Sequence, residues 1–494
     1  MQPSILVALA GACALALAMP AEATRSLGSL EFEPCVLSAP LSVMNVEAQC
    51  TKLAVPEIPG DPNSRQIELS IAWVPTENSA GADDPLFMIA GGPGQSALES
   101  YPVLHGAFRE VRKNRHVILV DQRGTGGSNR LVCKFAEGDA AAVDEGLYED
   151  PDAWRGFAER CRDELAGQAD LRYYGTTEAI TDLDAVRAAI GVQQINLLGV
   201  SYGTRVAQQY MRRYPEHTRS VVLDSVVPNT LALGGEHARN LEDALDLHFA
   251  QCAAVKACAE RFGSPREALN ALLAELRDAP RPVSVRDPLS GEQKQSLLRP
   301  GHVAIVARMY SYAPALAAML PLSLHEAMQG RADVLMAQAE MISGSLSEQI
   351  THGMQLSVLC TEDIDRIRPD PIDATRLLGE VMTQSMREQC AVWPRGQRPA
   401  DFNEPVESAI PTLLLSGEFD PVTPPRYGDE VARTLSNSRH LVLRGQGHSI
   451  AGAGCMPRIL GDFIETAQIG ELDVECLDSL QPNPPFAGFY GWEP

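Results

Sequence analysis

The stretch from Asn196 to Thr204 constrains the fold of this 494-residue chain more than any other. An apolar run over residues 195–198 predicts a buried strand, and the residues from Thr204 onward have helical spacing. Between them lies the pattern Gly-x-Ser-x-Gly, centred on Ser201. Glycines on both sides of a serine permit a sharp, strained turn that exposes its hydroxyl at the end of a strand. The stretch therefore predicts a strand, a tight turn that carries a nucleophile, and a helix.

Strand patterns alternate with helix patterns in the first half of the chain. Strands are predicted at residues 66–74, 85–90, 116–120 and 220–228, and a helix at residues 177–190. Such alternation is typical of an α/β fold with a mostly parallel sheet, whose ligand sites lie at the carboxyl ends of the strands. The candidate motifs of this chain all lie at such ends.

The strand pattern disappears between about residue 231 and residue 405. Helical stretches replace it, separated by proline-rich joints near residues 279–282 and 368–371. Helices inserted above a parallel sheet commonly cover its active site. We therefore predict an α/β domain formed by residues 24–230 and 406–494, interrupted by a helical cap at residues 231–405. The predicted cap helices cover residues 238–262, 265–277, 303–342, 348–363 and 373–392.

Two further residues complete a candidate catalytic triad with Ser201. A hydroxyl needs a base to remove its proton and an acid to orient that base. Asp420 follows one predicted strand and His448 follows the next, both downstream of Ser201. Taken singly, the histidine could be a surface residue and the aspartate a turn residue, and Glu418 is a rival acid. The order Ser, Asp, His at successive strand ends favours the triad.

A glycine-rich loop and a helix start supply candidate oxyanion donors. Residues 91–96 follow a buried strand, and glycines there allow backbone amides to point into a cleft. The alternative is an ordinary tight turn. The amide of Tyr202, at the start of the predicted helix, faces the place where an oxyanion would form. Downstream, Asp121 and Arg123 are predicted to brace loops by a mutual or a backbone hydrogen bond rather than to take part in chemistry.

The charge balance and the first residues indicate an exported protein. The chain has 41 basic and 64 acidic residues, a net charge of −23, which argues against nucleic acid or an anionic membrane as partner. Residues 4–19 are mostly apolar, and Ala21-Glu22-Ala23 fits the small-x-small pattern of a signal cleavage site. We predict a signal peptide at residues 1–23 and a periplasmic or extracellular protein without a stable membrane anchor. An uncleaved anchor and a lipoprotein based on Cys13 are the alternatives.

Ten cysteines remain after removal of the predicted signal. Their even number and scattered spacing fit disulfides in an oxidising compartment better than a metal site. Roughly 900 connectivities are possible for ten cysteines. Because short loops close most easily, we expect neighbours along the chain to pair, beginning with Cys35 and Cys50, with free buried thiols as the alternative.

Four motifs give the chain a resemblance to a known family. They are Gly91-Gly92-Pro93-Gly94, Asp121-Gln122-Arg123-Gly124, Gly199-Val200-Ser201-Tyr202-Gly203-Thr204 and Gly417-x-x-Asp420. Together they resemble the proline iminopeptidase and tripeptidyl aminopeptidase group of α/β-hydrolases, over nearly the whole mature chain. The resemblance implies a serine exopeptidase that acts on free N-termini. It implies Ser201 as nucleophile, Asp420 as orienting acid, His448 as general base, and the amides of Gly92 and Tyr202 as oxyanion hole.

Two positions depart from the proline iminopeptidase pattern. Ala90 stands where those enzymes usually carry histidine, and Tyr202 stands where they usually carry tryptophan. Both fit the exported, tripeptidyl-aminopeptidase-like branch better. The size of the released unit stays open.

An aminopeptidase of this group must also hold the substrate ammonium, which the family does with carboxylates from the cap. Glu362 and Asp363, at the end of a predicted cap helix, are the candidates for this role. The alternative is a helix-end acid pair held by local hydrogen bonds beside a disulfide.

The sequence as a whole predicts an exported, disulfide-bonded serine aminopeptidase that works through an acyl-enzyme. Its partner would be a peptide with a free N-terminus, and no metal or organic cofactor is implied, because no histidine or carboxylate pair has ligand spacing. An esterase or lactonase on the same scaffold is the first rival, since fold and triad do not choose between ester and amide. A binding protein that kept the fold without turnover is the second.

Overall fold

The computed structural model describes residues 24–40, 42–78, 81, 83–133, 151–286 and 290–492. The predicted signal peptide at residues 1–23, with Cys13, lies outside the described residues, so its cleavage stays a prediction. In the described part of the chain, no helix is both long enough and apolar enough to cross a bilayer.

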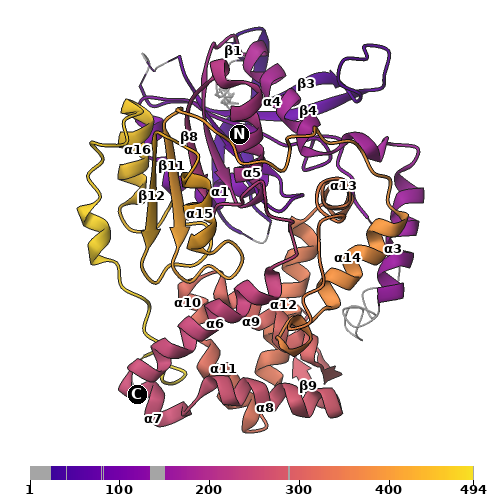
Figure 1. The fold of residues 1–494 in the computed structure, drawn as a ribbon, viewed down its shortest axis with the longest axis vertical. Coiled ribbons are helices and arrows are strands. Elements are labelled where there is room, and N and C mark those ends of the chain that lie inside the picture. Colours follow the sequence, from indigo (N-terminus) through magenta and orange to yellow (C-terminus); the bar gives the residue numbers. More distant parts are fainter. Residues whose placement is uncertain are drawn as a thin grey trace, which may run out of the picture.

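Ten strands of the described residues form one mixed sheet (Figure 1), in the order β1-β2-β3-β4-β6-β5-β7-β8-β11-β12. The neighbours from β6 to β12 run parallel, as the alternation of strands and helices predicted. The pairs from β1 to β6 are antiparallel, and β1 to β3 are an edge that the sequence analysis did not anticipate. The strands are β1 (Arg25–Leu27), β2 (Leu30–Ser38), β3 (Asn45–Pro56), β4 (Gln66–Val74), β5 (Leu86–Ile89), β6 (Val117–Val120), β7 (Ile195–Val200), β8 (Thr218–Asp224), β11 (Thr412–Gly417) and β12 (Ser438–Leu443).

Helices cover both faces of the parallel strands, so each strand contributes to two cores. Because side chains alternate along a strand, Leu197 of β7 packs in one core with Val206 of α5. Its neighbour Leu198 packs in the other core with Tyr101 of α1 and Leu460 of α16. Burial on both faces explains the continuous apolar runs in the sequence. The helices are α1 (Ala97–Leu104), α3 (Pro151–Leu165), α4 (Thr176–Ala189), α5 (Tyr202–Arg213), α15 (Pro425–Ala432) and α16 (Met456–Thr466).

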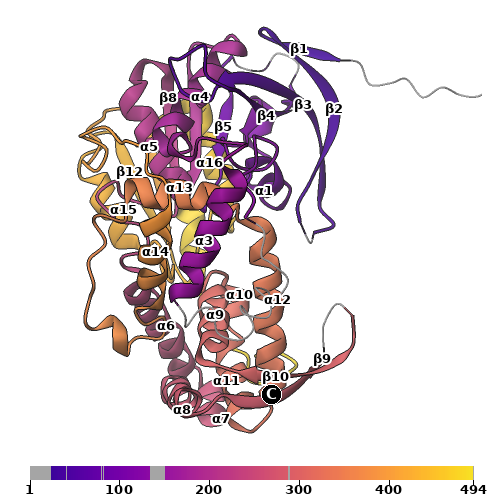
Figure 2. The same ribbon diagram turned by 90° about the vertical axis from the view of Figure 1, so that its right-hand side faces the viewer.

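The segment between β8 and β11 begins with a unit that has its own hydrophobic core, below the sheet in Figure 1. The prediction of helices alone was wrong here, because β9 and β10 form an antiparallel hairpin that Figure 2 shows at the edge of this unit. The predicted helix at 303–342 is four helices. Pro314 is the first residue of one of them and Pro321 the second residue of the next, positions that favour a helix start. The elements are α6 (His237–Ala254), α7 (Lys256–Phe262), α8 (Pro265–Asp278), β9 (Arg281–Arg286), β10 (Gln293–Leu298), α9 (Pro300–Ser311), α10 (Pro314–Ala317), α11 (Leu320–Met328) and α12 (Asp333–Gln349).

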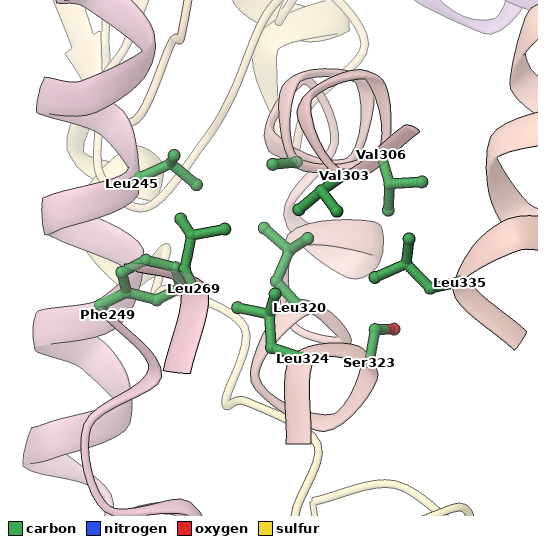
Figure 3. A pocket seen from close by; sticks show the side chains of 10 residues that line it. Leu245, Phe249, Leu269, Val303, Val306, Leu320, Ser323, Leu324 and Leu335 are labelled. Atoms are coloured by element: carbon green, nitrogen blue, oxygen red, sulfur yellow. The ribbon is translucent and has the colours of Figure 1, made fainter. Parts of the chain in front are cut away.

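A small cavity of about 10 Å³ lies inside this unit (Figure 3). Its labelled side chains come from α6, α8, α9, α11 and α12, and Ser323 is the one polar residue among them. A volume of this order holds about one water molecule. The cavity is therefore a gap in packing and not a substrate site.

The rest of the inserted segment packs against the sheet domain instead. It contains α13 (His352–Glu362) and α14 (Val381–Val392), which a disulfide between Cys360 and Cys390 joins. Side chains of both helices, such as Met354 and Met386, belong to the hydrophobic core that α4 and α5 share with the sheet. The inserted segment therefore has two parts with different packing partners.

Five disulfides join cysteines that are neighbours along the chain, as the sequence predicted. Each closes a loop of 6 to 30 residues. The pairs are Cys35–Cys50, Cys133–Cys161, Cys252–Cys258, Cys360–Cys390 and Cys455–Cys476.

The C-terminal tail, described over residues 481–492, crosses from the sheet domain to the inserted unit. It leaves the last helix and runs past α10 toward α7 (Figure 1). Pro482 packs so closely on Gly445 that a Cβ atom there would lie 2.4 Å from it. Further along, the amide of Phe486 donates to the carbonyl of Ala318, 2.8 Å away, just after α10.

Asp121 and Arg123 brace loops, as predicted, but not through each other. Asp121 accepts hydrogen bonds from the Ser96 hydroxyl and two backbone amides. Arg123 is fully buried and pairs with both carboxylate oxygens of Asp182 at 2.7 Å. Its remaining Nη1 donors reach the carbonyls of Glu57 and Tyr173.

Replacing Arg123 with methionine should lower the free energy of unfolding by about 3–5 kcal/mol, because it leaves the Asp182 carboxylate buried without a partner. Urea titration measures this. Arg172→Met, which removes the exposed pair with Asp170, is the matched control and should cost about 1 kcal/mol or less. The double variant Arg123→Met/Asp182→Leu should recover part of the loss. Equal stability of the two single variants would contradict the bracing role.

Candidate active site

Ser201 lies at a strained turn between β7 and α5. Its backbone has φ 55° and ψ −122°, a conformation that costs energy for a residue with a side chain. The flanking glycines make the turn possible. A Cβ atom on Gly199 would lie 2.3 Å from the carbonyl oxygen of Gly203, and one on Gly203 would lie 2.4 Å from that of Ile89. The local sequence thus fixes the half-buried serine at the carboxyl end of the strand.

The glycine-rich loop after β5 lies against the nucleophile. A Cβ atom on Gly91 would be 3.1 Å from Cβ of Ser201. Among the described residues, neither the Gly92 amide nor the Tyr202 amide has a hydrogen-bond acceptor. Tyr202 begins α5, where the helix dipole adds partial positive charge. The two amides are therefore available to a negatively charged oxygen next to Ser201.

Asp420 and His448 form a hydrogen-bonded pair after β11 and β12. Asp420 Oδ2 is 2.8 Å from His448 Nδ1. The other oxygen of Asp420 accepts from the amides of Val422 and Thr423, each at 2.8 Å. Glu418, the rival acid, instead accepts from the amide of Gly445 at 2.7 Å. The geometry therefore favours Asp420 as the acid that orients His448, with Nε2 left for proton transfer.

Electrostatics suit His448 to act as a base. Burial alone would lower the pKa of His448, but the charge and the hydrogen bond of Asp420 raise it above its ordinary value of 6.5, and Asp224 adds to this rise. Burial would raise the pKa of Asp420, but His448 and two backbone amides hold it below its ordinary value. The carboxylate thus stays ionised beside an imidazole with increased proton affinity.

Asp224, at the end of β8, joins the nucleophile turn to the histidine loop. Its backbone carbonyl accepts from the Ser201 amide at 2.9 Å. Its buried carboxylate accepts from the amides of Ile450 and Ala451 at 2.9–3.0 Å. No sequence motif predicted this role for Asp224. Its position at a strand's carboxyl end, inside an otherwise apolar run, was the available signal.

Ser201 and His448 reach the same edge of the sheet without a direct hydrogen bond. In the conformation described, neither Ser201 Oγ nor His448 Nε2 has a hydrogen-bond partner among the described residues. Such contacts are often long in enzymes without substrate and shorten in the complex. The candidate triad therefore has its Asp–His half formed and its Ser–His half open.

The inserted segment touches the histidine loop directly. The His448 amide donates to the carbonyl of Tyr312 at 2.9 Å, and the two rings meet edge to face with centroids 4.9 Å apart. Tyr312 directly follows α9. The helical pattern predicted a cap but not which of its residues contact the site, because that depends on how the helices pack.

Glu362 and Asp363 are buried and already paired. The Glu362 carboxylate accepts from the amide of Thr176 at 2.7 Å and from its hydroxyl at 3.0 Å. Asp363 pairs with Arg205 at 2.9 Å and with Arg366 at 3.0 Å. Burial raises the pKa of Glu362 to about 8. Besides the nearby Arg366, the partners are distant in the sequence, so the acid pair joins α13 to α4 and α5 instead of being held by local hydrogen bonds alone. Amine binding by these residues stays a prediction.

Among the residues described, no group of three or more histidine, cysteine, aspartate or glutamate side chains could hold a metal ion.

Comparison with known proteins identifies the family. Residues 84–452 match the family of the alpha/beta hydrolase fold, and the chain belongs to this family. The serine protease Hip1 of Mycobacterium tuberculosis is 27% identical over 470 residues, which cover 86% of each chain. The tripeptidyl aminopeptidase of Streptomyces lividans is 25% identical over 465 residues, 88% of this chain and 85% of the relative. Carboxylesterase B of Mycobacterium tuberculosis is 28% identical over 226 residues, 43% of each chain. The chain is thus a serine hydrolase.

Exchange of Asp420 for asparagine should lower kcat by about 10⁴-fold and shift the pH profile. Because Asp420 raises the pKa of His448, the acid limit of kcat/KM should lie above pH 6.5 in the unchanged enzyme and move to lower pH in the variant. Hydrolysis of a chromogenic substrate from pH 4 to 9 measures both. Glu418→Gln is the control and should keep the original limit. An unchanged limit in Asp420→Asn would contradict the assignment.

Proposed function

We propose that the protein is an exported serine aminopeptidase that releases single residues or short peptides from free N-termini. The observation that carries this proposal is the Asp420–His448 pair beside the strained turn of Ser201. The similarity to a tripeptidyl aminopeptidase over 88% of the chain supports the choice of peptide over other acyl substrates.

The arrangement accounts for each step of peptide hydrolysis. Ser201 Oγ attacks the scissile carbonyl while His448 Nε2 takes the hydroxyl proton. The amides of Gly92 and Tyr202 hold the oxyanion of the tetrahedral intermediate. His448 then gives the proton to the leaving amine, and an acyl-enzyme on Ser201 remains. Water, deprotonated by His448, attacks this ester, and its collapse returns the free serine and releases the N-terminal unit.

Export of the protein is part of the proposal. The five disulfides support it, because disulfides persist in oxidising compartments such as the periplasm and the extracellular space. The predicted signal peptide at residues 1–23 is consistent with it.

Ester hydrolysis is the second candidate function. The similarity to carboxylesterase B over 43% of the chain favours it, and the same triad cleaves esters. Peptidase and esterase differ in whether the substrate amine is recognised.

The discriminating experiment compares aminoacyl and tripeptidyl anilides, with free and acetylated N-termini, against simple nitrophenyl esters. We expect turnover of the free-amine anilides, loss of at least tenfold in kcat/KM on acetylation, and no activity in Ser201→Ala. The better peptide length gives the released unit. Ester turnover alone, abolished in Ser201→Ala, would replace the aminopeptidase by the esterase.

A second experiment tests the predicted amine-binding acids. Because Glu362 and Asp363 already have internal partners, we expect Glu362→Gln and Asp363→Asn to lower the melting temperature while the preference for free over acetylated anilides persists. Glu388→Gln, which alters an acid on α14 that pairs with Arg155, is the control. Loss of the preference in either variant, with the fold intact, would assign the ammonium to that carboxylate.

A further inference from the structure

The carboxyl end of α9 covers His448, because Tyr312 contacts the histidine there through its backbone and its ring. We call this end of α9 the roof. It carries Arg308, which has no acidic partner among the described residues. Arg308 lies four residues earlier, and residues four apart share one face of a helix. Arg308 therefore lies one turn along the same face as the tyrosine that touches the catalytic imidazole.

The Arg308 guanidinium makes few hydrogen bonds to the described residues. In the described part of the chain, its one hydrogen-bond partner is the thioether sulfur of Met382 on α14, 2.9 Å from Nη1. A thioether is a weak acceptor, and a guanidinium has five N–H donors. The buried arginines Arg123 and Arg205, by contrast, each meet a carboxylate. A half-buried cation that no carboxylate of the described residues pairs with, in a chain with 64 acidic residues, is suited to an anion from outside.

The charge of Arg308 influences the pKa of His448. It opposes the rise in the pKa of His448. It also lowers the pKa of His237, at the start of α6, which burial together with Arg308 brings to about 3. His237 is therefore neutral at ordinary pH. Arg308 is therefore a cation of the roof whose charge acts on the histidine.

The position of Arg308 beside His448 indicates which part of the substrate it meets. His448 delivers its proton to the leaving amine, so groups next to this imidazole face the leaving unit rather than the acyl unit with the free N-terminus. We propose that Arg308 binds a carboxylate on the leaving unit and so selects peptides with an acidic group just beyond the scissile bond. The group is a C-terminal carboxylate or an acidic side chain. The proposal rests on the peptidase function proposed above.

The test uses the acyl unit that is cleaved best as an anilide, extended by one residue. Three peptides are compared: alanine with a free carboxylate, alanine amide and aspartate amide as the leaving unit. We expect the free acid to exceed the alanine amide in kcat/KM by about tenfold or more, the effect of one charge-assisted hydrogen bond. Rescue of the amide by aspartate would show that a side-chain carboxylate serves as well, and its failure would restrict the site to a C-terminal carboxylate.

Variants locate the effect. Arg308→Met should bring the ratio of acid to amide close to one, Arg308→Lys should retain part of it, and Arg277→Met, an exposed arginine on α8, should retain all of it. Arg308→Met should also move the acid limit of kcat/KM to higher pH, since one of the influences that lower the pKa of His448 is removed while Asp420 and Asp224 still raise it and His237 is neutral. Labelling of Ser201 by a fluorophosphonate confirms that the variant is folded.

Several outcomes would overturn the proposal. Equal cleavage of acid and amide by the unchanged enzyme, or an undiminished ratio in Arg308→Met, would remove the role of Arg308 and leave the peptidase function standing. Failure to cleave both the peptides and the free-amine anilides would remove the peptidase function, and the proposal with it.

Discussion

The candidate active site of this hydrolase depends on one buried aspartate. Asp224 holds the Ser201 turn through its carbonyl and the histidine loop through its side chain. A charge in such a place is stable only because backbone amides replace water around it. The three residues of the candidate triad follow three separate strands. Asp224, at the end of β8, links the turn that carries Ser201 to the loop that carries His448. Asp420 then orients the imidazole of His448, whose loop Asp224 holds.

The inserted segment contributes to the site in two different ways. Its second part braces the site, because the Thr351 amide before α13 donates to the carbonyl of Gly94 in the oxyanion loop at 2.9 Å. Its first part covers the site, with Tyr312 against the histidine and Arg308 one turn away. The two parts belong to different hydrophobic cores, so the glycine-rich loop is fixed to the sheet while the roof has packing of its own.

Local patterns in the sequence predicted the features that local forces determine. Paired glycines predicted the turn at Ser201, strand ends predicted Asp420 and His448, and short loops predicted the disulfide pairs. The β9–β10 hairpin was missed because its strands are short and partly exposed. The partners of Glu362 and Asp363 could not be predicted from the sequence for another reason. Arg205 is 158 residues away from Asp363 in the chain, and only packing of α5 against α13 brings them together.

The C-terminal tail changes how the roof can move. A domain inserted into a sheet is attached at two points, where the chain enters it and where the chain leaves, and two points define an axis about which it can swing. Here the tail adds a further, non-covalent attachment, because the amide of Phe486 donates to the carbonyl of Ala318 just after α10. The hydrogen bond from the His448 amide to the Tyr312 carbonyl also holds this domain, so the tail adds to the contacts that oppose a swing about the two crossings. Detachment of the tail would remove one of these restraints on the roof.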